Sequence, residues 1–442
     1  MQFIPHTEKD KEEMLKKIGV GSFEELLSTM PKEAMLAKKL NLPKPLSELQ
    51  VSDLLSSLAH KNRLGTTFIG GGVYDHFIPA VVDVVCSRPE FYTAYTPYQA
   101  EVSQGTLQSI FEYQSMICEL TGMDVSNASM YDGASALAES VHMARSITSR
   151  NEILLSDLIN PNYIEVVKTY CWGLNVKIDV VPHKNGQTDL DKLAEMMDEK
   201  KSCFLLQHPN FFGCLEEVDE IEKIVHRNGA LFVVCVDPIS LGLLKPPGEY
   251  NVDIAVGEGQ PLGLPPNFGG PFLGIFTTKK EYVRQLPGRL VGETVDTEGK
   301  RGYILTMQTR EQHIRRERAT SNICTNEALC ALACCVYLSL LGKKGIQEVA
   351  ELCVQKSHYL YERIGKLNGF STAFNAPFFK EFVIRCKSSP EEILKNLASK
   401  NIFGGLALSK FRVEWKDLLL VAVTEKRTKE DMDRLVEELK SL

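Results

Sequence analysis

The sequence lacks any long block of one charge and carries little net charge for its length. Its 50 basic residues nearly balance its 57 acidic ones, and a formal net charge of −7 over 442 residues argues against nucleic acid as the main partner. Hydrophobic residues make up 44% and charged residues 24% of the chain, so disorder, collagen and coiled coil are not expected. What remains is the globular class, in which a chain of this length can bury a sizeable core.

The N-terminus lacks the apolar region of a secretory signal. Its first twenty residues mix glutamate and aspartate with several lysines, a composition that also argues against an acid-poor transit peptide. We therefore expect a cytoplasmic protein in a reducing compartment.

The 12 cysteines lack the spacing of a metal or redox site, because neither a CxxC nor a Cys/His motif occurs. Four of them, Cys324, Cys330, Cys334 and Cys335, crowd into one apolar stretch. We interpret them as small packing residues of a buried helix, with a redox or metal role as the less favoured alternative. No metal site is expected.

The sequence also lacks an apolar run long enough to cross a membrane. The most apolar segment, 328–341, is shorter than the roughly 20 residues that a membrane-spanning helix needs, and Gly342 and two lysines follow it. We expect a central core helix or a subunit-interface helix, and no membrane partner.

Three parts can be distinguished along the chain. Residues 1–62 show a helical pattern with glycine and proline breaks and predict an N-terminal helical arm, in which Ser22 and Glu25 offer a capping box. Residues 63–326 alternate apolar runs with amphipathic stretches, which predicts a large α/β domain with a mainly parallel sheet covered on both faces. Residues 327–442 predict the long helix and a smaller C-terminal α/β domain.

The hydrophobic pattern places individual elements. Strands are predicted at 153–155, 176–181, 203–207, 231–236, 273–276, 381–386 and 418–423. Helices are predicted at 135–149, 216–229, 390–400 and 429–439. The consecutive glycines Gly70 to Gly72 indicate a loop that needs positive φ.

Two segments could hold an anion or a cofactor at the carboxyl ends of the strands. Asp132, Gly133 and Ser135 stand where a helix begins, and its free N–H groups could bind a phosphate, although Asp-Gly-x-Ser is also an ordinary helix start. Asp237 follows an apolar strand, where an acid can pair with the ring nitrogen of pyridoxal phosphate (PLP), although an Asp there is also a common turn residue. Both alternatives stay open.

Several long motifs resemble one protein family. They are FIPHTEKDKEEMLKKIG, TTFIGGGVYDHFIPAVVD, FYTAYTPYQAEVSQGTLQSIFEYQSMICELTGMDVSNASMYDGASALAES, RRERATSNICTNEAL and LLVAVTEKRTKEDMD. The chain resembles the glycine decarboxylase (P protein) family of the glycine cleavage system, specifically the N-terminal subunit of its two-chain forms. The resemblance covers nearly the whole length, and TPYQAEVSQGTLQ and TSNICTN are too long for chance similarity.

The resemblance implies a fold type I PLP-dependent transferase-like fold, an aspartate aminotransferase-like three-layer sandwich. It implies a hetero-oligomeric glycine dehydrogenase in which PLP binds glycine, carbon dioxide leaves, and the aminomethyl group passes to the lipoyl group of H protein. The implied partners are the PLP-carrying glycine decarboxylase subunit 2 and lipoylated H protein, with T and L proteins acting in the same system.

The sequence lacks the lysine that holds PLP as a Schiff base in such enzymes. No lysine occurs from Pro246 to Thr278, and by similarity to the catalytic subunit Gln260 falls at the lysine position, 260 − 237 = 23 residues after Asp237. An amide nitrogen is not a nucleophilic amine, so we expect no covalent PLP on this chain and no activity of the chain alone. The resemblance then implies a vestigial cofactor site made of Asp132, Gly133, Ser135, Asp237 and Gln260.

Two polar segments are candidates for completing the partner's active site or for lining a lipoyl channel. The first is a run that contributes Tyr95, Tyr98, Gln99, Glu101, Ser103 and Gln104. An interface loop whose polar groups satisfy one another is an equally good interpretation. The second comprises Thr320, Ser321 and Asn322, because the matching loop in fold type I dimers often approaches the neighbour's phosphate. A helix cap by Asn322 or Thr325 is nearly as well supported.

Other interpretations remain open. The chain could be an independent PLP enzyme that uses Lys245 or Lys279, which flank the lysine-free segment, or a purely structural subunit. The basic run Arg315, Arg316 and Arg318 could attract an acidic H protein, but a solvated run is favoured.

Overall fold

The computed structural model describes residues 5–36, 38, 40–267 and 269–441. It divides the chain into two units, Met1–Arg63 and Leu64–Leu442. The first boundary lies one residue from the end of the expected arm. The expected boundary between residues 326 and 327 falls inside the second unit.

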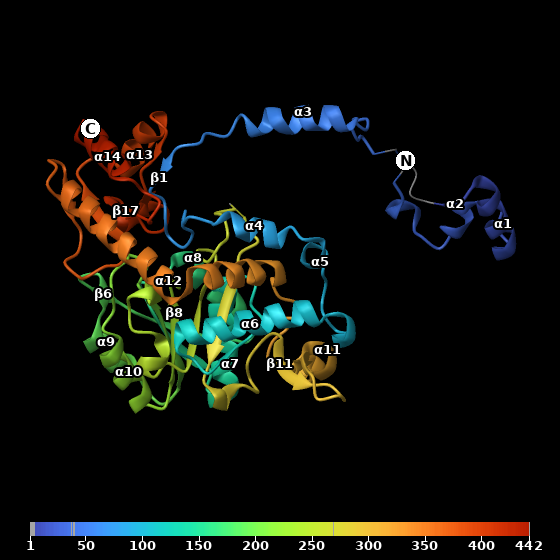
Figure 1. Cartoon of the computed structure of the whole chain (residues 1–442), viewed down its shortest axis with the longest axis horizontal. Helices are drawn as coiled ribbons and strands as arrows, with labels where there is room; N and C mark the ends of the chain where they lie inside the picture. The colour runs from blue at the N-terminus through green and yellow to red at the C-terminus, as the bar shows by residue number, and fades with distance from the viewer. Residues whose placement is uncertain (1–4, 37, 39, 268, 442) are drawn as a thin grey trace. The chain divides into compact units, whose positions relative to one another are not determined.

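The first unit is a series of short helices, labelled at the N-terminal end of the chain in Figure 1. Its elements are α1 (Glu8–Ile18), α2 (Phe23–Leu26), η1 (Lys32–Ala34) and α3 (Glu48–Ala59). Local capping explains where they begin: Ser22, for example, accepts a hydrogen bond from the Glu25 N–H at the start of α2. None of the described residues in these helices is buried, so the arm has no core of its own.

The second unit is built on a seven-stranded sheet in the order β2-β10-β9-β8-β7-β3-β4. Its central strands run parallel, whereas β10 pairs antiparallel with β9 and with β2. The strands are β2 (Val125–Ser126), β3 (Glu152–Ser156), β4 (Lys177–Val181), β7 (Lys201–His208), β8 (Leu231–Val236), β9 (Ile254–Glu258) and β10 (Gly274–Thr278). The mainly parallel sheet predicted from the sequence is confirmed.

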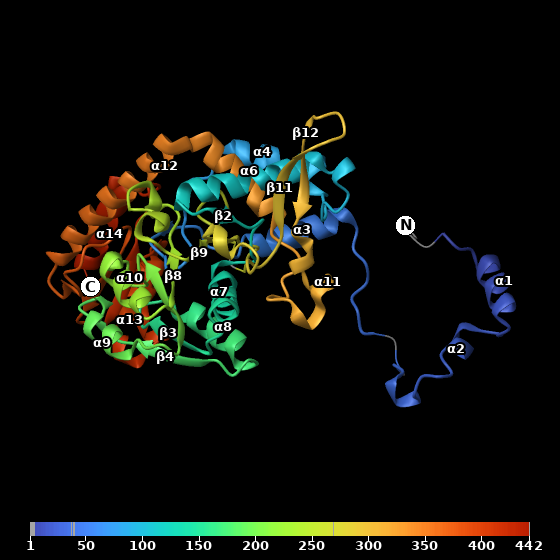
Figure 2. The same ribbon diagram turned by 90° about the horizontal axis from the view of Figure 1, so that it is seen from below.

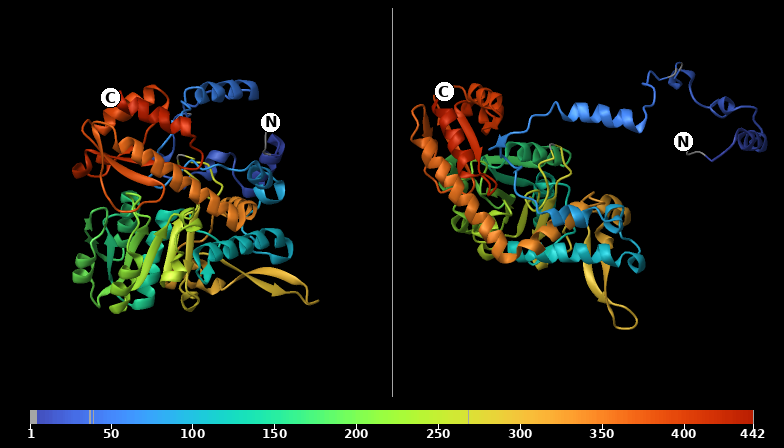
Figure 3. Two further views of the ribbon diagram at one scale, coloured as in Figure 1. Left: turned by 60° about the vertical axis from the view of Figure 1, so that its left-hand side comes forward. Right: turned by 45° about the horizontal axis from the view of Figure 1, so that its top comes forward.

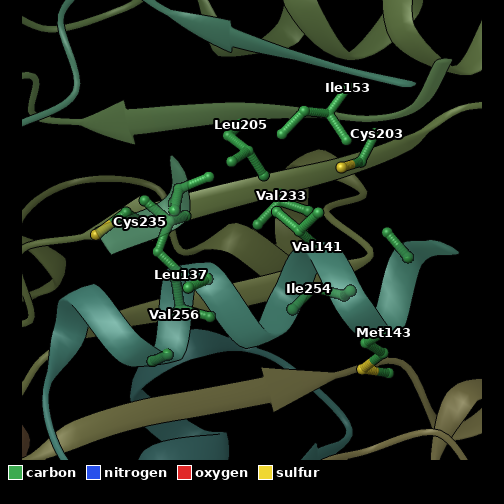
Figure 4. Close-up of a cluster of buried hydrophobic side chains, with 14 of the residues drawn as sticks. Leu137, Val141, Met143, Ile153, Cys203, Leu205, Val233, Cys235, Ile254 and Val256 are labelled. Atoms are coloured by element: carbon green, nitrogen blue, oxygen red, sulfur yellow. The ribbon is translucent and has the colours of Figure 1, made fainter. Parts of the chain in front are cut away.

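Helices cover both faces of this sheet, and α7/α8 and α9/α10 flank it in Figure 2. Alternate residues of a strand point to opposite faces. Leu205 and Val233 therefore pack with α7, while Phe204 and Phe232 pack with α10. Figure 4 shows Leu137, Val141 and Met143 of α7 packed against the side chains of four strands. The helices are α7 (Gly133–Thr148), α8 (Pro161–Trp172), α9 (Leu190–Met196) and α10 (Val218–Arg227).

The remaining part of the second unit contains a four-stranded antiparallel sheet with its own hydrophobic cluster. The strands are β13 (Phe370–Thr372), β14 (Glu381–Cys386), β16 (Leu406–Ala407) and β17 (Leu418–Ala422), and the helices are α13 (Pro390–Ser399) and α14 (Lys429–Lys440). The segment after the arm joins this part, because β1 (Thr66–Thr67) pairs in parallel with β15 (Ile402–Phe403).

The long helix α12 (Ala328–Gly365) links the two sheets and packs beside α4 (Ala80–Cys86) and α6 (Gln104–Thr121). The sequence predicted a helix over 328–341, and the structure continues it past a kink at Gly342, where φ is +57°. By length and composition this helix could cross a membrane. Its apolar part instead belongs to a core cluster, in which Cys330, Cys334 and Tyr337 are buried.

A two-stranded hairpin, β11 (Leu290–Val295) with β12 (Arg301–Thr306), projects from the second unit in both views of Figure 3. Beside it lies the short helix α11 (Gln312–Arg315) in Figure 1. The helix α5 (Pro89–Tyr92) precedes the 3₁₀ turn η2 (Ala100–Val102), which contacts β12. The chain segments that carry the two candidate polar loops therefore lie at this end of the unit.

Candidate functional site

The expected cofactor-site residues come together at the carboxyl ends of β8 and β9. These strands are parallel neighbours, with Val236 opposite Gly257. Asp237 follows β8, Glu258 ends β9, and α7 begins at Gly133 beside Glu258. Gln260 lies two residues beyond β9.

At the start of α7, Asp132 and Ser135 hydrogen-bond to each other. The Ser135 N–H donates to Oδ1 of Asp132 over 2.7 Å, and the Asp132 N–H is 3.2 Å from Oγ of Ser135, which together form a capping box. The alternative of an ordinary helix cap thus describes the contacts that these two residues make.

The N–H of Gly133 is taken by Glu258. It donates to Oε2 of Glu258 over 2.9 Å, while Oε1 of the same carboxyl accepts the N–H groups of Gln260 and Leu273, each over 3.0 Å. Burial raises the pKa of Glu258 to about 8, and the three N–H donors oppose that rise. A Cβ atom at Gly133 would lie 3.0 Å from Glu258 and from the Tyr163 hydroxyl, so packing at the helix start is already close.

Asp237 is paired with a lysine from a distant part of the chain. Nζ of Lys380, immediately before β14, lies 2.7 Å from Oδ2 of Asp237. The Lys380 side chain is 1% exposed, and its ammonium lies 3.6 Å from the centre of the Tyr74 ring. A second Asp237 oxygen accepts the N–H of Ile239 over 3.1 Å.

The same ammonium continues into a buried hydrogen-bonded chain. Lys380 donates to Nε2 of His76 over 3.0 Å, which leaves Nδ1 of His76 to donate to Oε2 of Glu425 over 2.6 Å. Burial and the nearby Lys380 charge lower the pKa of His76. Burial alone would raise the pKa of Glu425, but the hydrogen bonds from His76 and from the Phe77 N–H outweigh it and lower this pKa to about 2.

His76, Cys353 and Glu425 form the one group among the described residues whose ligand atoms could surround a metal ion, within 4.8 Å of one another. Both ring nitrogens of His76 are already hydrogen-bonded, and the adjacent Lys380 is a cation. His76, Cys353 and Glu425 therefore fit a hydrogen-bonded cluster better than a metal site.

Gln260 is fully buried and its amide groups are satisfied. Oε1 accepts the Tyr74 N–H over 2.9 Å, and Nε2 donates to the Tyr74 carbonyl over 3.0 Å and to the Leu264 carbonyl over 2.7 Å. The two flanking lysines bind elsewhere: Lys245 pairs with Asp219, and Lys279 with Asp253. Neither lysine lines the pocket around Asp237.

The glycine-rich loop closes this pocket from another side. Gly71 and Gly72 have φ of +77° and +116°, as three consecutive glycines predicted, whereas Gly70 is needed because a Cβ there would lie 2.1 Å from Glu381. Glu381 accepts the Gly71 N–H and the Tyr74 hydroxyl, both over 2.7 Å, and burial raises its pKa to about 7. The water-accessible space in this pocket is about 30 Å³, enough to hold a water molecule.

The polar run after α5 is mostly solvent-exposed. Tyr95 is 85% exposed, and Gln99 and Glu101 are also exposed. The Tyr98 hydroxyl accepts from the buried Arg289 over 3.2 Å, while its ring stays half exposed. Gln104 is used internally, because its amide binds the N–H and carbonyl of Tyr303. Ser103 precedes α6 without capping it through its side chain.

Thr320, Ser321 and Asn322 line an open cavity of about 540 Å³ together with Arg316. Glu139 of α7 also lines this cavity, buried and with no hydrogen-bond partner for its Oε2 among the described residues. The expected alternative of a helix cap by Asn322 or Thr325 is wrong, since α12 begins after Glu327 and has no side-chain cap. The neighbouring residues Arg315, Arg316 and Arg318 are exposed.

Sequence reasoning missed three charged residues that line the pocket, Glu258, Lys380 and Glu381. It also missed His76, which accepts a hydrogen bond from Lys380. Two signals were present: Glu258 lies two residues before Gln260, and Lys380 and Glu381 bring opposite charges to the start of a predicted strand. Their meeting with Asp237 depends on the tertiary fold, which a local pattern does not report.

The amino-acid sequence is similar to those of one known protein family. Residues 1–439 match the family model for the glycine cleavage system P-protein. The probable glycine dehydrogenase (decarboxylating) subunit 1 of Carboxydothermus hydrogenoformans is 55% identical over 443 residues, which cover 99% of each chain.

Solved structures give the same relationship. A crystal structure of glycine decarboxylase (P-protein) of the glycine cleavage system, in inhibitor-bound form, matches with a TM-score of 0.92 and 45% identity over 100% of both chains. A C-DES variant with glycine covalently linked to its PLP cofactor matches with a TM-score of 0.63 and 17% identity, over 90% of this chain and 100% of that chain. The second match shows the shared α/β fold alone.

Proposed function

Because this chain belongs to the glycine cleavage system P-protein family, we propose that it is the subunit of a glycine decarboxylase that carries no covalent cofactor and completes the active site of a PLP-carrying partner subunit. The assembly binds glycine through the partner's PLP, releases carbon dioxide and passes the aminomethyl group to the lipoyl group of H protein. The T and L proteins act on the products, and we place the whole system in the cytoplasm.

One observation carries this proposal: the position expected for the Schiff-base lysine holds Gln260, buried and bonded on both sides of its amide. Among the described residues that line the pocket, Lys380 is the one lysine, and Asp237 already pairs with it. A free amine is what covalent PLP binding requires. The reading of this chain as an independent PLP enzyme through Lys245 or Lys279 is therefore disfavoured.

The groups that this chain offers to a partner are the exposed ones near the hairpin. Tyr95, Tyr98, Gln99 and Glu101 present two phenol rings, an amide and a carboxylate on one loop. The guanidinium of Arg289 packs against the face of the Tyr98 ring, 5.4 Å from the ring centre. A supported aromatic residue beside polar groups suits a substrate or lipoyl channel better than a wholly solvated loop does.

The alternative is a structural subunit that contributes no group to the chemistry, and substitution in the assembled enzyme separates the two. We expect Tyr98→Phe and Glu101→Gln each to lower glycine–bicarbonate exchange at least about tenfold, as for the loss of a positioned hydrogen bond of about 1.4 kcal/mol. Val102→Ala, on the same exposed loop, is the matched control and should leave exchange unchanged. Normal exchange in both polar variants, with normal assembly, would leave only the structural role.

A further inference from the structure

We propose that this chain fills its own cofactor pocket: Lys380 replaces the cationic ring nitrogen of PLP at Asp237, Glu258 replaces the phosphate at the start of α7, and the resulting contacts hold the two sheets of Leu64–Leu442 together. The proposal deepens the proposed function and rests on it, because it explains why PLP stays on the partner. It adds that restoring a lysine at position 260 is not enough to restore binding.

The phosphate end of the pocket is closed by a carboxyl group. A phosphate at a helix start takes the first free N–H groups of the helix. Here the first of them, from Gly133, already donates to Glu258, as do two further N–H groups from Gln260 and Leu273. A Cβ atom at Gly133 would lie 3.0 Å from the Tyr163 hydroxyl and from the Glu258 backbone nitrogen, so the helix start is closely packed. Glu258 and Asp132 thus occupy the Gly133 and Ser135 N–H groups that a phosphate would use.

The ring end is closed by an ammonium group. An acid at the end of such a strand holds the protonated nitrogen of a pyridine ring. Lys380 brings a positive charge to 2.7 Å from Asp237, so the acid has its cation without any cofactor. The ammonium also lies over the Tyr74 ring and donates to His76, which satisfies the remaining directions of a buried cation.

The same contacts connect parts that lie far apart in the chain. Asp237 follows β8 of the seven-stranded sheet, and Lys380 precedes β14 of the four-stranded sheet. His76 lies in the segment after β1, and Glu425 lies after β17. Glu381, next to Lys380, binds Gly71 and Tyr74. Breaking a buried ion pair from one side leaves an uncompensated charge. The filled pocket therefore keeps the two sheets closed on each other.

The remaining volume agrees with this assignment. By the same measure, the pocket leaves about 30 Å³, whereas the open groove between α4, α6 and α12 leaves about 570 Å³. On this assignment, Lys380 and Glu258 occupy the places that the ring nitrogen and the phosphate of PLP would take.

In the first test, PLP is added to the assembled enzyme and any Schiff base is reduced with borohydride. The subunits are then separated and their masses are measured by mass spectrometry. We expect no adduct on this chain for Gln260→Lys alone, and a stoichiometric adduct for Gln260→Lys combined with Lys380→Ala and Glu258→Ala. An adduct on the single variant, or none on a triple variant that still assembles, would overturn the proposal. An adduct on the unsubstituted chain would instead overturn the proposed function.

A second test holds even where the triple variant fails to fold. We expect Lys380→Met to lower the Tm of this chain by about 5 °C or more, because Asp237 is left buried without its cation. Adding Asp237→Asn to Lys380→Met should recover more than half of that loss. Additive effects of the two substitutions on Tm would show that Lys380 and Asp237 are not coupled. That result would contradict the proposal that this ion pair holds the two sheets together.

Discussion

At the scale of single residues, the difference between a cofactor pocket and a filled one comes down to three side chains. Gln260 lacks the amine that PLP needs, Glu258 accepts the first N–H group of α7, and Lys380 pairs with Asp237. Each of these three side chains is buried and hydrogen-bonded. A buried polar group is tolerated on this condition.

One buried carboxyl outside the pocket makes stability depend on pH. Burial raises the pKa of Glu139 from 4.5 to about 7, against the hydrogen bond from Ser321. The folded state then binds a proton that the unfolded state releases, so this contribution is complete below pH 4.5 and is lost as the pH rises through 7. We expect Glu139→Gln to flatten the fall in unfolding free energy over that range by about 2 to 3 kcal/mol, measured by urea unfolding at several pH values.

The control for this measurement is Glu165→Gln on the exposed face of α8, which should leave the pH profile unchanged. An unchanged slope in the Glu139 variant would show that this carboxyl is ionised in the folded protein throughout the range.

At the scale of elements, the arm and the C-terminal helix differ in what they bury. No described residue of α1, α2 or α3 is buried, whereas α14 buries Met432, Leu435, Val436 and Leu439. We expect removal of residues 1–63 to leave the Tm of the rest unchanged within about 2 °C, because no core is exposed. Removal of residues 429–442 should prevent folding, because it opens the cluster under the four-stranded sheet. Calorimetry of both truncations checks this, and a large loss from the first would mean that the arm supports the core.

The strands that could be predicted from the sequence are those whose apolar runs have clear ends. Strands β8 and β14 match the predicted 231–236 and 381–386, because their apolar runs have clear ends. Strand β9 was missed, since its run of five residues is short and ends in Gly-Glu. The antiparallel placement of β10 was also missed, because direction is set by the connecting loop and leaves no local pattern.

Some residues of the candidate site could be placed from the sequence, and others could not. Asp237 could be placed from the sequence because it directly follows a predicted strand, and Gln260 because its segment resembles that of the catalytic subunit. Lys380 and His76 could not, because they come from 143 residues after and 161 residues before Asp237, by 380 − 237 and 237 − 76. Long-range pairing of this kind is fixed by packing between elements, for which a single sequence carries no signal.

At the scale of the whole molecule, a P-protein family chain has the fold of a PLP enzyme with a pocket closed by its own side chains. Such a chain can serve an assembly in two ways: by holding its own two sheets rigid, and by presenting an exposed polar loop to a partner. The composition agrees, since the balanced charge of −7 marks no dedicated polyanion surface and the described cysteines are free.

The most direct measurement is the cofactor content of each subunit in the assembled enzyme. The assembly is saturated with PLP, reduced with borohydride and separated, and each intact subunit is weighed. We expect one PLP adduct on the partner subunit and an unshifted mass for this chain of 49.5 kDa. A PLP adduct on this chain, at Lys380 or at any other lysine, would contradict the account.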